Sequence, residues 1–133
     1  MNNELKLKIF LVDDDALYLK NEESELNNKN EFDIETFANA ELCLANLYKN
    51  PDVIILDYWL NGVETNSMNG EQALDKIKRF NSDIPVVIHS AQEKIDVAIN
   101  CMHHRAFDYV VKSRKAIQEL RQIITTIKQM NIV

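Results

Sequence analysis

Three adjacent carboxylates, Asp13 to Asp15, follow the apolar segment KIFLV at residues 8–12. Like charges crowded at the end of a buried segment repel one another, so they add nothing to folding by themselves. A divalent cation would relieve this repulsion. A site with two or three carboxylate oxygens suits Mg²⁺, which keeps several waters and completes its shell with phosphate oxygens. The acidic run therefore predicts a magnesium site.

Three more polar residues stand at the ends of other apolar segments: Asp57 closes DVIILD, Ser90 closes PVVIHS and Lys112 closes FDYVVK. A lysine ammonium can pair with carboxylates or with phosphoryl oxygens, and a serine hydroxyl can donate to a phosphoryl oxygen. A carboxylate can itself accept a phosphoryl group as an aspartyl phosphate. Together with a metal ion, these residue types predict phosphoryl transfer.

The elements that must position these residues alternate along the chain. Short apolar segments rich in β-branched and aromatic residues predict five strands, at residues 8–12, 32–37, 52–57, 85–90 and 107–112. Helical spacing predicts five helices between and after them, at residues 17–26, 40–48, 70–80, 95–102 and 116–129. This pattern predicts an open, doubly wound α/β fold, in which ligands bind beyond the carboxyl ends of the parallel strands.

Length, charge and residue composition exclude several classes of function. The 133 residues, 46% of them hydrophobic, predict one domain over 1–133 with a core at about 8–129. The net charge of -6 argues against direct binding of nucleic acid. No signal peptide and no apolar segment long enough to span a membrane is evident, so we expect no membrane partner and a cytoplasmic location. Two glycines cannot form a GxGxxG or Walker-type loop, so no nucleotide cofactor is expected. Cys43 and Cys101 are expected to be reduced core residues.

Four motifs, in this order and on these strands, carry a resemblance: VDDD (12–15), IILD (54–57), HSA (89–91) and YVVK (109–112). They resemble the receiver domain of bacterial two-component response regulators, over residues 8 to about 129. The resemblance implies a CheY-like, flavodoxin-like (βα)5 fold with a five-stranded parallel sheet in the order 2-1-3-4-5. It also implies a phosphorylation-dependent signalling switch that catalyses only its own phosphorylation and autodephosphorylation.

For the metal site, the resemblance implies that Asp14 and Asp57 bind Mg²⁺ directly and that Asp13 binds it through water. The backbone carbonyl of Trp59 is implied as a further ligand. Asp15 is expected to begin or cap the first helix instead of binding metal.

For the phosphoryl group, the resemblance implies that Asp57 is the acceptor and that Ser90 and Lys112 hold the transferred group. Tyr109 is implied to change rotamer on activation as Ser90 moves toward the phosphoryl group. The output face is then expected to be the fourth helix, fifth strand and fifth helix, which could also serve a homodimer. A sensor histidine kinase, a phosphotransfer protein or acetyl phosphate would supply the phosphoryl group.

Two positions depart from the family pattern. Receivers usually carry a proline in a cis peptide after the conserved lysine, whereas Ser113 follows Lys112 here, so either a strained bond is kept or the loop is rebuilt. The segment between Asp57 and Gly70 is longer than usual and lacks its proline, and we expect it to be mobile or to contact a partner.

Three hypotheses remain open. The first is the phosphorylation-dependent switch, with Trp59 and Gln92 tuning the access of water to the phosphoaspartate. The second is a receiver-like module that binds its partner without phosphorylation. The third is a Mg²⁺-dependent phosphohydrolase, which would usually carry an acid two residues after the nucleophile, where Trp59 stands.

Overall fold

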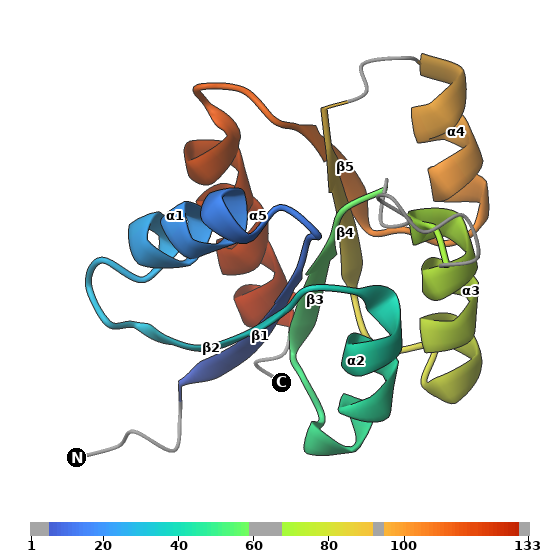
Figure 1. Cartoon of the computed structure of the whole chain (residues 1–133), viewed down its shortest axis with the longest axis horizontal. Helices are drawn as coiled ribbons and strands as arrows, with labels where there is room; N and C mark the ends of the chain where they lie inside the picture. Colours follow the sequence, from blue (N-terminus) through green and yellow to red (C-terminus); the bar gives the residue numbers. More distant parts are fainter. Residues whose placement is uncertain (1–5, 59–67, 92–94, 131–133) are drawn as a thin grey trace.

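The computed structural model describes residues 6–58, 68–91 and 95–130, which alternate between strands and helices as the sequence predicts (Figure 1). The strands are β1 (Leu7–Val12), β2 (Phe32–Phe37), β3 (Val53–Leu56), β4 (Val86–Ser90) and β5 (Asp108–Val111). The helices are α1 (Ala16–Leu26), α2 (Ala40–Ala45), a 3₁₀ turn η2 (Leu47–Lys49), α3 (Gly70–Phe80), α4 (Ile95–His103) and α5 (Ala116–Met130).

The strands form one parallel sheet in the order β2-β1-β3-β4-β5, which confirms the predicted topology. Val12, the last residue of β1, lies opposite Phe37 on one side and Leu56 on the other. Ser90, the last residue of β4, lies opposite Val111. Leu56, the last residue of β3, lies opposite Ile88, so β4 and β5 extend two residues further, and the residues that follow the strands lie at one edge of the sheet.

Helices cover both faces of the sheet. Helices α1 and α5 lie on one face and α2, α3 and α4 on the other (Figure 1). Alternate residues of β1 serve the two faces, because Ile9 and Leu11 belong to the core beneath α1 and α5 while Phe10 and Val12 belong to the core beneath the other helices. This burial on both faces explains why the central strands are continuously apolar.

The second helix is shorter than the predicted 40–48. It ends at Ala45 because the backbone N–H of Asn46 bonds to the Cys43 carbonyl, three residues back, while the Asn46 side chain donates to the Leu42 carbonyl. These bonds end the α-helix, and a 3₁₀ turn follows. The side chain of Asn39 caps the beginning of the helix by accepting a hydrogen bond from the Leu42 N–H.

The two cysteines are buried, as predicted. Cys43 in α2 and Cys101 in α4 have no exposed surface and pack in the same core cluster. Burial raises the pKa of the Cys43 thiol to about 12, and burial followed by the Glu71 carboxylate raises that of Cys101 to about 11. Both groups are therefore neutral thiols at physiological pH.

The helices in the described ranges are all too short or too polar to cross a bilayer.

Candidate functional site

Backbone hydrogen bonds extend the sheet by one residue beyond the strand ends and so place the site residues. The N–H of Asp57 donates to the Val12 carbonyl at 2.9 Å, which sets Asp57 beside Asp13. In the same way, the N–H of Lys112 donates to the Ser90 carbonyl at 2.8 Å. The residues predicted to carry the chemistry are therefore neighbours because of strand register alone.

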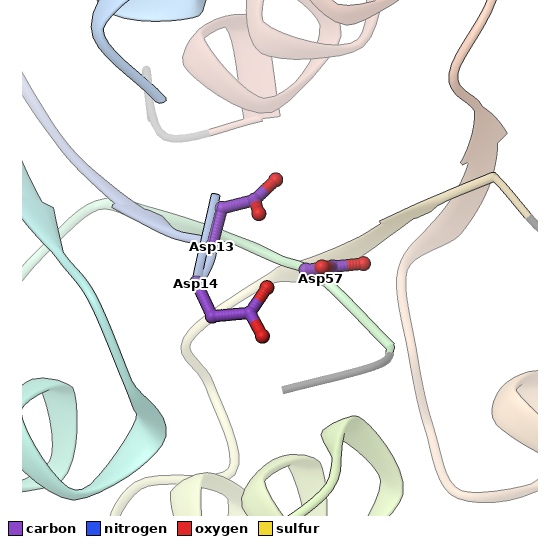
Figure 2. Close-up of side chains that lie close together, drawn as sticks. All are labelled: Asp13, Asp14 and Asp57. Carbon is purple, nitrogen blue, oxygen red and sulfur yellow. The ribbon is translucent and has the colours of Figure 1, made fainter. Parts of the chain in front are cut away.

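Three carboxylates gather at this edge. One oxygen each from Asp13, Asp14 and Asp57 lies within 4.8 Å of the other two, and the side chains reach from the ends of β1 and β3 toward the same side (Figure 2). Asp13 and Asp57 are buried, at 2% and 6% exposure, whereas Asp14 is exposed. Hard oxygen donors that are sheltered on one side and open to water on the other fit Mg²⁺, which retains part of its hydration shell.

Lys112 is the cation of this acidic group. Its ammonium lies 2.7 Å from Oδ2 of Asp13 and 3.6 Å from Oδ2 of Asp57. Burial alone would lower the pKa of Lys112, but the hydrogen bond to Asp13 and the charge of Asp57 outweigh it and raise that pKa. The lysine therefore remains charged and offsets part of the carboxylate repulsion.

Ser90 and Tyr109 belong to β4 and β5, which lie on the opposite side of β3 from the strand that precedes Asp13 and Asp14. Ser90 is fully buried at the end of β4, on the sheet face opposite His89. Burial raises the pKa of the Tyr109 phenol, and a side-chain hydrogen bond with Ser90 partly offsets that effect. The two predicted switch residues are thus already linked to each other.

Gly70 lets α3 begin directly against the backbone that follows Asp57. Its N–H donates to the Tyr58 carbonyl at 2.7 Å, and a Cβ at this position would lie 2.5 Å from Cα of Tyr58. The side chain of Asn69 caps the helix, and Gln72 completes a reciprocal capping box. Only glycine allows this close approach, so Gly70 fixes the backbone beside the site.

The other predicted site residues have mixed outcomes. Asp15 accepts a hydrogen bond from the Tyr18 N–H and caps α1, as predicted. No peptide bond within the described ranges is cis, so Ser113 follows Lys112 through a trans bond. Trp59 and Gln92, and most of the long segment after Asp57, lie outside the described residues.

Comparison with known proteins identifies the family. Residues 9–125 match the model of the response regulator receiver domain. The chain belongs to the response regulator receiver domain family. This receiver therefore has the fold and the class of function that its motifs imply, a signalling domain of two-component systems.

This receiver resembles part of a longer response regulator and the whole of two solved receiver domains. It is 34% identical over 130 residues to a putative NtrX-like response regulator of Rickettsia typhi, and this match covers 89% of the chain and 27% of the relative. It is 25% identical to the crystal structure of the NtrX receiver domain from Brucella abortus, with a TM-score of 0.76 over 90% of this chain and 98% of that one. A BeF3-activated DrrB receiver domain has the same fold, with a TM-score of 0.80, 22% identity and coverage of 94% and 99%.

Sequence reasoning missed a buried polar group beneath Lys112, on the α1 side of the receiver. Tyr18, Glu22 and His89 are not among the predicted site residues. The Tyr18 hydroxyl lies 2.9 Å from Nε2 of His89, and Oε2 of Glu22 lies 3.1 Å from the same nitrogen. One signal was available: Leu19, Glu22 and Leu26 share helical spacing, so a carboxylate stands within an apolar stripe.

Proposed function

We propose that this receiver is a switch in which Asp57 accepts a phosphoryl group from a sensor histidine kinase, a phosphotransfer protein or acetyl phosphate. The observation that supports the proposal is one buried carboxylate, Asp57, close to two other carboxylates and a lysine ammonium at a single sheet edge. Such a carboxylate would attack phosphorus, and the charges around it would stabilise the transferred group.

In the transfer step, a carboxylate oxygen of Asp57 forms a bond to phosphorus. The bond between phosphorus and the donor atom, an imidazole nitrogen or an acetate oxygen, breaks and the leaving group keeps the electron pair. Lys112 is in position to pair with one phosphoryl oxygen and the Ser90 hydroxyl can donate to another. Hydrolysis later returns inorganic phosphate and the free carboxylate, so the domain acts only on its own phosphoryl group.

Asp14 and Asp57 would bind Mg²⁺ directly and Asp13 would bind it through water, with the Trp59 carbonyl as a further ligand. When bound, the ion supplies positive charge that offsets the phosphoryl oxygens. The chemistry of the donors supports this assignment because all three side chains offer carboxylate oxygens within reach of one another.

The signal would leave through the face built from α4, β5 and α5. Ser90 and Tyr109 are hydrogen-bonded to each other at the edge of that face, so a Ser90 drawn toward a phosphoryl group would change the environment of Tyr109. Ile95, Ile99 and Met102 expose apolar surface on α4, which supports a protein partner or a second copy of the chain there.

We further propose that residues 1–133 form one receiver domain, that it is located in the cytoplasm, and that it makes no direct contact with nucleic acid or membrane.

The test is covalent labelling with phosphoramidate and Mg²⁺, followed by intact mass and by beryllofluoride titration. We expect one phosphoryl group on the wild type, none on Asp57→Asn, and a normal adduct on Asp83→Asn, whose carboxylate is exposed and distant in sequence. A wild type that takes up neither phosphoryl nor beryllofluoride would be a phosphorylation-independent module. Rapid multiple turnover of the donor would instead indicate a phosphohydrolase.

A further inference from the structure

We propose that Tyr18 is a positioning residue for Lys112: its aromatic face holds the ammonium beside the carboxylates, and His89 holds the ring through the phenol hydroxyl. This inference rests on the proposed function, because it explains how the phosphoryl-binding cation is kept in place. Three contacts within the described residues carry it.

The first contact joins Lys112 to the ring. The ammonium lies over the Tyr18 ring, 4.4 Å from its centroid, while it is also 2.7 Å from Asp13. The lysine side chain is only 17% exposed, so the attraction between cation and ring is little weakened by water. Lysine carries its charge on a flexible four-carbon stem, and contacts on two sides restrict that freedom.

The second contact fixes the far end of the ring. The Tyr18 hydroxyl lies 2.9 Å from Nε2 of His89, and Nδ1 of His89 lies 3.0 Å from the Val110 carbonyl. A carbonyl oxygen only accepts, so Nδ1 carries the proton and donates to Val110. His89 is 1% exposed and fixed by that bond, which leaves Nε2 facing the phenol as a rigid anchor.

The third contact adds a buried carboxylate. Glu22 is one helical turn after Tyr18 on α1, is 3% exposed and brings Oε2 to 3.1 Å from Nε2 of His89. This oxygen makes no hydrogen bond to any described residue, so the Tyr18 phenol is the hydrogen-bond partner of Nε2. Burial, then the charge of Glu22, raises the pKa of Tyr18, and the hydroxyl therefore keeps its proton.

These contacts connect three elements of the fold to the ammonium of Lys112. Tyr18 belongs to α1, His89 to β4, and Lys112 follows β5, so the ring joins the first helix to the strand that carries the switch serine. A change at His89, next to Ser90, would reach Lys112 through the ring. The role is one of positioning, because Tyr18 acts through its contact with the lysine.

The kinetic test compares Tyr18→Phe, Tyr18→Leu and, as a matched control, Tyr48→Leu, whose tyrosine is 68% exposed. Phosphorylation of Asp57 by phosphoramidate is followed at saturating Mg²⁺. We expect Tyr18→Leu to react about 3- to 30-fold more slowly, the range from a partly exposed to a desolvated cation–π contact. Tyr18→Phe keeps the ring face but loses the contact with His89, so its rate should fall between those of the wild type and Tyr18→Leu. Tyr48→Leu should match the wild type. A Tyr18→Phe rate as low as that of Tyr18→Leu overturns the role of the ring face.

A second measurement does not depend on any variant folding. In protein with ¹³C-labelled lysine, the ε-methylene protons of Lys112 should resonate upfield of those of exposed Lys115, because they lie near the face of an aromatic ring. The displacement should persist in Tyr18→Phe and disappear in Tyr18→Leu. Identical positions for Lys112 and Lys115 in the wild type would overturn the contact itself.

The outcomes separate the two proposals. A wild type that is phosphorylated and a folded Tyr18→Leu variant that reacts at the same rate overturn the positioning role alone. A wild type that forms no adduct overturns the proposed function, and the lysine resonances then still decide whether Tyr18 holds Lys112.

Discussion

The ammonium of Lys112 lies 2.7 Å from Oδ2 of Asp13, although 99 positions separate the two residues in sequence. The same ammonium is 3.6 Å from Asp57, so one lysine is shared by two buried carboxylates. A divalent ion bound by these carboxylates would meet a positive charge already in place. Lys112 therefore competes electrostatically with Mg²⁺ while supporting the phosphoryl group.

Replacement of Lys112 by methionine should separate these two effects. We expect Mg²⁺ to bind roughly fivefold more tightly, since about 1 kcal/mol of repulsion is removed, while phosphorylation becomes slower. Without Mg²⁺ the free energy of unfolding should fall by about 1 to 3 kcal/mol, because the carboxylates lose their partner. Isothermal titration and denaturation measure these quantities, with exposed Lys115→Met as the control. Unchanged or weaker Mg²⁺ binding would contradict the competition.

Removal of one carboxylate should raise the stability of the Mg²⁺-free protein and remove most of the stabilisation by Mg²⁺. Asp14→Asn relieves repulsion within the acidic group, so its melting temperature without Mg²⁺ should exceed that of the wild type. Mg²⁺ at about 100 times its Kd should stabilise the wild type by about 2.7 kcal/mol and leave the variant almost unchanged. Asp15→Asn is the matched control, because asparagine also caps a helix well and Asp15 serves as a cap. An equal response of Asp14→Asn and wild type to Mg²⁺ would remove Asp14 from the metal site.

Addition of one methyl group at Gly70 should disturb the backbone beside Asp57. The new Cβ of Gly70→Ala would lie 2.5 Å from Cα of Tyr58, and backbone atoms cannot rotate away. We expect a loss of about 1 to 3 kcal/mol in the free energy of unfolding, and weaker beryllofluoride binding. Chemical denaturation of this variant and of Lys76→Ala, an exposed position on α3, makes the comparison. A Gly70→Ala protein as stable as wild type would show that α3 can move away from the site without cost.

His104 should make stability depend on pH. It lies 2.8 Å from Asp75 and 3.0 Å from Glu71, both on α3, and so ties the end of α4 to that helix. The hydrogen bond to Asp75 raises the pKa of His104 above its ordinary value of 6.5, against a small opposing effect of burial. The charged form is therefore favoured in the folded state, so its stabilisation is complete below pH 6.5 and is lost as pH rises through the higher folded pKa.

The measurement is the difference in unfolding free energy between wild type and His104→Gln. It should be larger at about pH 5.5 than at about pH 8.5, because the folded state favours the charged imidazole and this contribution falls as pH rises. His103→Gln, at the exposed neighbouring position, is the control. A constant difference for His104→Gln would mean that the pair contributes no charge-dependent stability.

The fold and the acidic site were predictable for a common reason. Continuous apolar runs such as the one ending at Val12 indicate strands buried on both faces, and parallel strands bring their carboxyl ends together. Once the order of strands is set, Asp13 and Asp57 become neighbours through register, with no need to know any side-chain packing. The same reasoning placed Ser90 and Lys112 at that edge.

Contacts across layers were not predictable in this way. Strand alternation puts His89 on the face opposite Ser90, but periodicity does not reveal which helix lies over that face. The meeting of His89 with Tyr18 and Glu22 depends on how α1 crosses the sheet, which is a result of packing. The early end of α2 was missed for a different reason, since it depends on local bonds made by Asn46.

The two buried thiols give this receiver a built-in pair of probes. Cys43 belongs to α2 and Cys101 to α4, and both thiols are protonated and buried. An alkylating reagent can therefore reach either thiol only when its helix moves away from the sheet. The relative labelling rates therefore compare the opening of two helices within one molecule, without any added dye. A receiver that transmits its signal through α4 should alter the rate at Cys101 on phosphorylation and leave that at Cys43 unchanged.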